Sequence, residues 1–216
     1  MSMRFLHLTL LAAAIALSAS CATKFEAADA ARVNSIAISR VAEPKYYAAS
    51  YFVARRDEVT PAASADFNSL MERQNLRLGA ELAAGVGEAL RKNGYAVTQG
   101  DGRDGDAVLD LTIGGFLPDQ LGPTYAAHGA QFEPEFMMRA RLTDEKTKKT
   151  LFSQFYLVAN NSLKPMDGTI LVEPDKKFYV SSTRDLFEKP TIAAAGFRSA
   201  IPLLAQQIAQ ALKKNP

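Results

Sequence analysis

The chain has 216 residues, 48% of them hydrophobic, and its 25 Lys and Arg residues nearly balance 23 Asp and Glu residues, which gives a formal net charge of +2. This balance lacks the basic excess typical of nucleic-acid binding, so we expect no nucleic-acid partner. A chain of this length can bury a core as one domain without disulfides, and it contains a single cysteine.

The first twenty residues have the parts of a secretory signal: a positive charge at Arg4, an apolar core over Phe5–Ala19, and small residues before a cleavage point. This core is shorter than the roughly 20 residues that span a bilayer, although a retained signal anchor stays open as an alternative. The sequence Leu17–Cys21 resembles a bacterial lipobox, with serine where leucine is preferred three positions before the cysteine. We therefore expect residues 1–20 to be a lipoprotein signal peptide and Cys21 to be lipidated, with ordinary cleavage and a free thiol as the alternative.

By resemblance to bacterial lipoproteins, Cys21 would carry three acyl chains, which hold a protein firmly on a membrane. Ala22 follows it, instead of the aspartate that retains such lipoproteins in the inner membrane. The resemblance therefore implies the periplasmic face of the cell outer membrane of a Gram-negative host. Residues 21–32 are expected to be the lipidated N-terminus and a short tether, which reaches about 36 Å when extended. Residues 33–216 are expected to form a single periplasmic domain.

Hydrophobic periodicity predicts the elements of the first half of this domain. Alternation over Val33–Val41 predicts a first strand, and Tyr51–Ala54 predicts a weaker second one. From Asp66 to Lys92 the apolar spacing becomes helical, which predicts one long helix. Asn93–Gly94 is a typical helix stop, and Tyr95–Thr98 is expected to run extended behind it.

The second half predicts more strands and one helix. Strands are expected at Ala107–Ile113, Phe136–Leu142, Leu151–Ala159, Gly168–Val172 and Phe178–Ser182. The second and third of these flank a charged turn and are expected to form a hairpin with one buried face. The last helix is expected to begin at Ser199, or near Thr191 with a kink at Pro202. Together the elements predict an α+β fold, a mainly antiparallel or mixed sheet with two long helices packed on one face.

Three segments carry a resemblance to a known group of proteins. Gly87–Val97 resembles a helix exit into a strand, Asp106–Leu111 a polar turn into a strand, and Arg141–Phe152 a hairpin with a charged tip. In this order they resemble the periplasmic modules related to the N-terminal domain of TolB and the penicillin-binding-protein activator LpoB. The resemblance is a pattern of elements without a catalytic signature. It implies a protein-interaction or envelope-assembly role, with an envelope protein as partner.

Residues suited to catalysis are few. The mature chain has one histidine, His128, and no Gly-x-Ser-x-Gly sequence, so we expect no enzyme and keep a hydrolase only as a third alternative. The acidic run of Asp101, Asp104 and Asp106 has oxygen ligands suited to calcium, but lacks the twelve-residue loop of an EF-hand. We expect a turn there, and neither a metal nor a cofactor.

Two segments, Leu117–Glu133 and Asn160–Lys177, are expected to be long loops that connect strands. Six of their residues are candidates for a partner-binding surface: Leu121, Tyr125, Phe132, Met166, Ile170 and Leu171. The alternative is that these side chains complete the core. The leading function is a lipid-anchored protein-interaction module. A component that handles lipid or lipopolysaccharide is the second, and an apolar cavity between sheet and helices would favour it.

Overall fold

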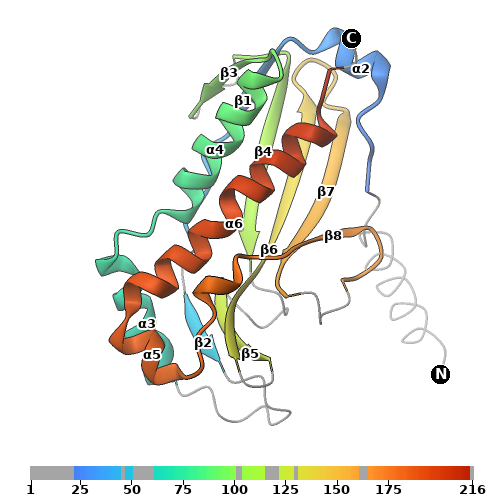
Figure 1. Cartoon of the computed structure of the whole chain (residues 1–216). Coiled ribbons are helices and arrows are strands. Elements are labelled where there is room, and N and C mark those ends of the chain that lie inside the picture. Colours follow the sequence, from blue (N-terminus) through green and yellow to red (C-terminus); the bar gives the residue numbers. More distant parts are fainter. Residues whose placement is uncertain are drawn as a thin grey trace, which may run out of the picture.

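The element order produces one mixed sheet with helices on one face, seen in the computed structural model (Figure 1). The structure describes residues 22–44, 47–50, 61–100, 104–114, 122–128, 131–160 and 165–214. The predicted signal peptide, Cys21, Leu121 and the predicted strand Tyr51–Ala54 lie outside these ranges. Within them, none of the helices combines the length and the hydropathy that a membrane span requires.

The strands are β1 Ser35–Ile38, β2 Ala48–Ser50, β3 Ala96–Gln99, β4 Ala107–Gly114, β5 Thr124–His128, β6 Gln131–Asp144, β7 Thr150–Val158 and β8 Thr169–Val172. They are ordered β2-β5-β6-β4-β1-β3, with β7 beside β6 and β8 beside β7. The pairs of β6 with β4, β5 and β7 are antiparallel, whereas β1 runs parallel to β3 and β4. The sheet is therefore mixed, as expected, with β6 at its centre.

The helices are α2 Ala27–Arg32, α3 Pro61–Arg73, α4 Leu78–Lys92, α5 Thr183–Glu188 and α6 Pro190–Ala211, with a short 3-10 turn, η1, at Lys176–Phe178. The two long helices, α4 and α6, pack side by side over one face of the sheet (Figure 1). This arrangement confirms the predicted α+β class with two long helices on one face.

The alternation of β6 separates a buried face of the sheet from an accessible one. Met138, Ala140 and Leu142 are buried and belong to the hydrophobic core that the long helices cover. Arg139 and Arg141, between them, lie on the opposite face, as the predicted hairpin with one wet face requires. Aromatic side chains occupy part of the space between sheet and helices, where the Phe197 ring of α6 packs against three other core rings.

Two predicted helices differ from the observed ones. The single helix expected over Asp66–Lys92 is two helices, since the chain breaks between α3 and α4 where Asn75 takes a positive φ of 49°. The last helix begins at Pro190, so the earlier of the two predicted starts is closer, and Pro202 lies inside it. The strand expected at Phe178–Ser182 is only one bridge, between Val180 and Phe132.

Candidate functional site

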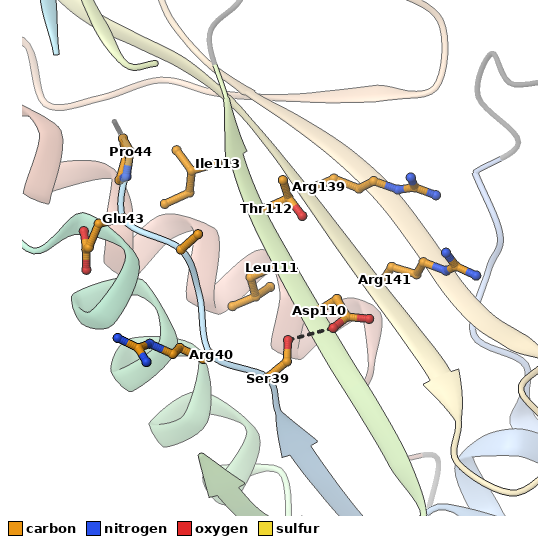
Figure 2. A pocket seen from close by; sticks show the side chains of 11 residues that line it. Ser39, Arg40, Glu43, Pro44, Asp110, Leu111, Thr112, Ile113, Arg139 and Arg141 are labelled. Carbon is orange, nitrogen blue, oxygen red and sulfur yellow. Dashed lines mark hydrogen bonds between the residues drawn. The ribbon is translucent and has the colours of Figure 1, made fainter. Parts of the chain in front are cut away.

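A groove opens where β1 separates from β4. β1 is paired with β4 only as far as Leu109, whose carbonyl accepts a hydrogen bond of 3.1 Å from the Ser39 amide. The chain then leaves the sheet, and in the described part of the molecule the last five residues of β4, 110–114, have a strand partner only in β6. The groove beside them has a volume of about 580 Å³ (Figure 2).

The exposed edge of β4 offers backbone hydrogen-bonding groups to this groove. Backbone groups of successive strand residues point alternately to the two neighbouring strands. Because the Leu109 carbonyl faces β1, the N–H and C=O groups of Leu111 and Ile113 face the same way and therefore point into the groove. Among the described residues no strand pairs with these groups, so the site presents two donors and two acceptors in a row.

The loop on the other side of the groove is fixed to α4. Glu43 accepts hydrogen bonds from the amides of Gly79 (3.0 Å) and Ala80 (2.9 Å), so its carboxylate caps the positive N-terminus of this helix from a distant part of the chain. A Cβ atom at Gly79 would lie 3.1 Å from the carbonyl oxygen of Ala42, which shows how closely the loop approaches. These contacts hold the groove open.

Three arginines line the groove, Arg40, Arg139 and Arg141, and none forms an ion pair with a carboxylate of the described residues. Arg141 donates to the hydroxyl of Thr150 at 3.0 and 3.3 Å. Arg139 donates at 3.4 Å to the hydroxyl of Ser153, and its buried Nε atom has no hydrogen-bond partner. Among the described residues, the guanidinium groups of Arg139 and Arg141 therefore have only neutral hydrogen-bond partners.

The two acidic residues of the groove are already engaged. Asp110 accepts a hydrogen bond of 2.7 Å from the hydroxyl of Ser39, drawn as a dashed line in Figure 2, and Glu43 caps α4. Figure 2 also shows Asp110, Arg139 and Arg141 on the side of the sheet opposite to Leu111. With three cationic and two anionic side chains, the lining favours an anionic ligand group.

The N-terminal segment pairs with the outer edge of β7, across β7 and β6 from β4. Thr23 and Ser153 exchange backbone hydrogen bonds of 2.9 and 3.0 Å, so the segment extends the edge of β7. Ser153 pairs with Arg141 of β6, and Arg141 pairs with Asp110 of β4. Thr23 is therefore aligned, across the strands, with the groove residue Asp110. Two strand spacings, about 10 Å, separate Thr23 from Arg141.

A second contact fixes the end of α2. The guanidinium of Arg32 donates to the buried carboxylate of Asp144, which also accepts from the backbone amides of Lys146 and Thr147. The Arg32 contact first, and then the Thr147 amide, hold the pKa of Asp144 well below its ordinary value. The segment expected to be a short tether is folded against the domain over Thr23–Arg32, because it gains a bridge to β7 and an ion pair.

The predicted partner-binding residues are not gathered in one place. Tyr125 and Phe132 are 0% and 3% exposed, because the expected loop Leu117–Glu133 contains β5 and the start of β6. Tyr125 packs edge-on against Phe197 and donates to the carbonyl of Phe178 at 3.1 Å. The expectation that these two side chains form a surface is wrong, and the alternative that they complete the core is correct.

The second expected loop, Asn160–Lys177, contains β8 and the start of η1. Met166 is 65% exposed before β8, whereas Ile170 and Leu171 are half-buried within it. None of the three lines the groove, and their role as partner contacts stays a prediction. The alternation of the hairpin predicts that Arg139 and Arg141 are accessible, but it does not indicate the groove, which depends on the distant loop that contains Arg40.

The acidic turn contains a structural aspartate. The Asp106 carboxylate accepts hydrogen bonds from the amides of Asn34 and Ser35, and these bonds lower its pKa. Asp106 thereby joins the starts of β1 and β4, as expected for a turn. Among the described residues there is no cluster of His, Cys, Asp and Glu that could hold a metal ion.

Comparison with known proteins gives likenesses in structure alone. No family model matches the chain, and no curated protein matches its sequence. Similar solved structures include a DUF330 protein from Xanthomonas campestris (14% identity, TM-score 0.44, 81% of each chain covered). Another is the PelC dodecamer from Paraburkholderia phytofirmans, with 11% identity, a TM-score of 0.40, and coverage of 86% of this chain and 91% of that chain. A third is the lipoprotein GNA1162 from Neisseria meningitidis, with 16% identity, a TM-score of 0.27, and coverage of 62% of this chain and 88% of that chain. At these identities and scores they carry no argument about function, and the resemblance to TolB and LpoB stays a prediction.

Proposed function

We propose that the chain is a lipid-anchored envelope protein that works without catalysis and binds another protein. The observation that carries this proposal is the groove at β4, where, among the described residues, the strand edge has no pairing strand and the nearby arginines form no ion pair. Open strand edges and exposed unpaired arginines are typical of surfaces that bind proteins. The proposed location is the periplasmic face of the outer membrane, with Cys21 as the lipidated residue.

The folded N-terminal segment supports a position directly on the membrane. Cys21 is two residues before Thr23, so its Cα atom lies within about 7 Å of the Cα of Thr23. Because Thr23 is hydrogen-bonded to β7, a lipid on Cys21 would hold the sheet edge at the bilayer surface. A partner in the groove would then be a protein of the same membrane or one that approaches it closely.

The lipid-handling alternative has less support. It predicts an apolar cavity between the sheet and the helices, and the described part of that space is occupied by side chains such as Phe136, Phe197 and Leu204. The groove that the structure shows beside β4 is lined largely by polar and charged residues. A polar groove suits a peptide better than an acyl chain.

The anchor is tested by replacing its single acceptor. Cys21→Ser removes the thiol that would take the lipid, so we expect the variant to leave the outer-membrane fraction and to change its mobility on a gel. Ser20→Ala, next to it, keeps the thiol and serves as the control. If Cys21→Ser still fractionates with the outer membrane at unchanged mobility, the lipid anchor is excluded.

The binding role is tested by photo-crosslinking in cells. A photoreactive amino acid at Thr112, which is exposed in β4 and lines the groove, should capture a discrete envelope protein that mass spectrometry then identifies. The same amino acid at Lys92, exposed at the end of α4, is the control for random collisions. Identical products from both positions, or none from Thr112, would contradict the proposed function.

A further inference from the structure

We propose that the open edge of β4 receives an extended segment of the partner protein with acidic side chains at alternate positions, and that Arg139 and Arg141 bind those carboxylates. This inference rests on the proposed function, because it names the chemistry of the partner. It is carried by two independent features of the described residues: β4 has no pairing strand on its groove side beyond Leu109, and Arg139 and Arg141 form no ion pair.

The backbone groups select a strand and not an isolated anion. Leu111 and Ile113 present N–H donors and C=O acceptors in alternation, and an added strand satisfies both kinds of group. An inorganic anion without a proton, such as sulfate, accepts hydrogen bonds only and would leave the two carbonyl groups without partners. Residues 110–114 rise by about 13 to 17 Å, which is room for four or five residues of a partner strand.

The side chains together favour negative charge, because three arginines outnumber Asp110, which Ser39 engages, and Glu43, which caps α4. Asp110 and Thr112 of β4 lie opposite Arg141 and Arg139 of β6, so both arginines lie across β4 from the proposed strand. Two strand spacings, about 10 Å, separate that strand from β6, a distance that long arginine and glutamate side chains cover together. Arg40 lines the near side of the groove and adds to the positive potential. Alternate residues of the partner face this side, which is why the acidic positions alternate.

The groove is formed before any partner binds. Glu43 is hydrogen-bonded to the first turn of α4, and Asp110 to Ser39, so the loop and the strand edge are both fixed in position. Binding to such a site needs little rearrangement of the protein, which favours affinity even for a short segment. Only the partner segment has to change, by becoming extended.

Binding is measured with the full chain, purified in a non-ionic detergent, and a fluorescent peptide of about eight residues with alternating valine and glutamate. We expect saturable binding by fluorescence anisotropy and slower amide exchange at Leu111 and Ile113. Arg139→Gln and Arg141→Gln should each weaken binding about three- to fivefold, since each removes one exposed ion pair. Arg184→Gln, an exposed arginine of α5, is the matched control and should not change it.

Two N-methylated versions of the peptide test strand addition directly. One carries methyl groups on the odd amides and the other on the even amides, so only one of them blocks the amides that face β4. We expect one version to bind and the other to fail. Equal binding of both versions, or of a peptide with lysine in place of glutamate, overturns the proposal. It is also overturned if anionic phospholipid vesicles or glutarate protect the same amides as well as the peptide does.

These outcomes are separate from those that test the proposed function. The peptide experiment does not depend on the anchor, because Cys21→Ser leaves the groove residues unchanged and should bind the peptide with the same affinity. One outcome is that the protein fractionates with the membrane and crosslinks to a partner at Thr112 without binding the glutamate peptide. That result would support the proposed function and exclude only an acidic strand as the partner. If the lipid anchor is excluded but the peptide still binds, the proposed membrane location is lost and the acidic strand is retained as the partner.

Discussion

Asp144 connects the N-terminal segment to the hairpin of β6 and β7 at the scale of single residues. Its carboxylate is buried and accepts hydrogen bonds from Arg32 and from two amides of the following turn. Since its pKa is lowered in the folded protein, the ionised carboxylate stabilises the fold above the ordinary value of 3.8, and this contribution is lost as the pH falls from there toward the folded pKa.

Asp144→Asn should therefore lower the melting temperature at neutral pH. Its melting temperature should also decrease less than that of the parent as the pH falls into the acid range. The amide cannot ionise, so the variant and the parent should converge as the pH drops below 3.8. Scanning calorimetry across the acid range measures both effects. Asp167→Asn, at an exposed position before β8, is the control and should follow the parent curve. A constant difference between Asp144→Asn and the parent at every pH would show that the ion pair does not contribute.

At the scale of elements, the contact of α6 with β5 depends on a glycine. A Cβ atom at Gly196 would overlap the hydroxyl of the buried Tyr125 and lie 3.3 Å from the Cβ of Phe178. Overpacking of a filled core costs about 1–3 kcal/mol, and the higher helix propensity of alanine offsets about 1 kcal/mol of this. We expect Gly196→Ala to lower the free energy of unfolding by up to about 2 kcal/mol, measured by urea denaturation.

Two variants control this prediction. Gly114→Ala, at the end of β4, adds a Cβ atom with no neighbour within 4 Å and should change stability little. Tyr125→Phe in the Gly196→Ala background removes the overlapping hydroxyl and should restore part of the loss, although it also removes the hydrogen bond to Phe178. If the double variant is no more stable than Gly196→Ala, the overlap is not the cause.

Elements with strong local periodicity were predictable from the sequence, whereas the groove was not. The β6 and β7 hairpin alternates clearly, so the pairing of these two strands and the accessible side of Arg139 and Arg141 followed from the pattern. The break at Asn75 has no proline or glycine to mark it, and β5 is short and flanked by turn residues typical of loops. The groove exists because Glu43 binds the N-terminus of α4, 36 and 37 positions away, and no local pattern reports such a contact.

At the scale of the whole molecule, the folded N-terminal segment predicts one orientation on the membrane. A free tether from Cys21 to Arg32 would let the domain move through about 36 Å, whereas the bridge of Thr23 to β7 leaves only about 7 Å of chain before the sheet. The face that carries Arg141 then lies near the bilayer. α5 lies far from the N-terminal segment, on the other side of the molecule (Figure 1).

This orientation can be measured by fluorescence quenching in proteoliposomes that contain lipids with spin-labelled head groups. A fluorophore on Arg141→Cys should be quenched more strongly than one on Arg184→Cys in α5, because only the first position lies within two strand spacings of Thr23. Adding Arg32→Gln and Asp144→Asn to both labelled proteins removes the contact at the end of α2 and should reduce the difference between them. Equal quenching at the two positions before those changes are made would show that the domain turns freely on its anchor.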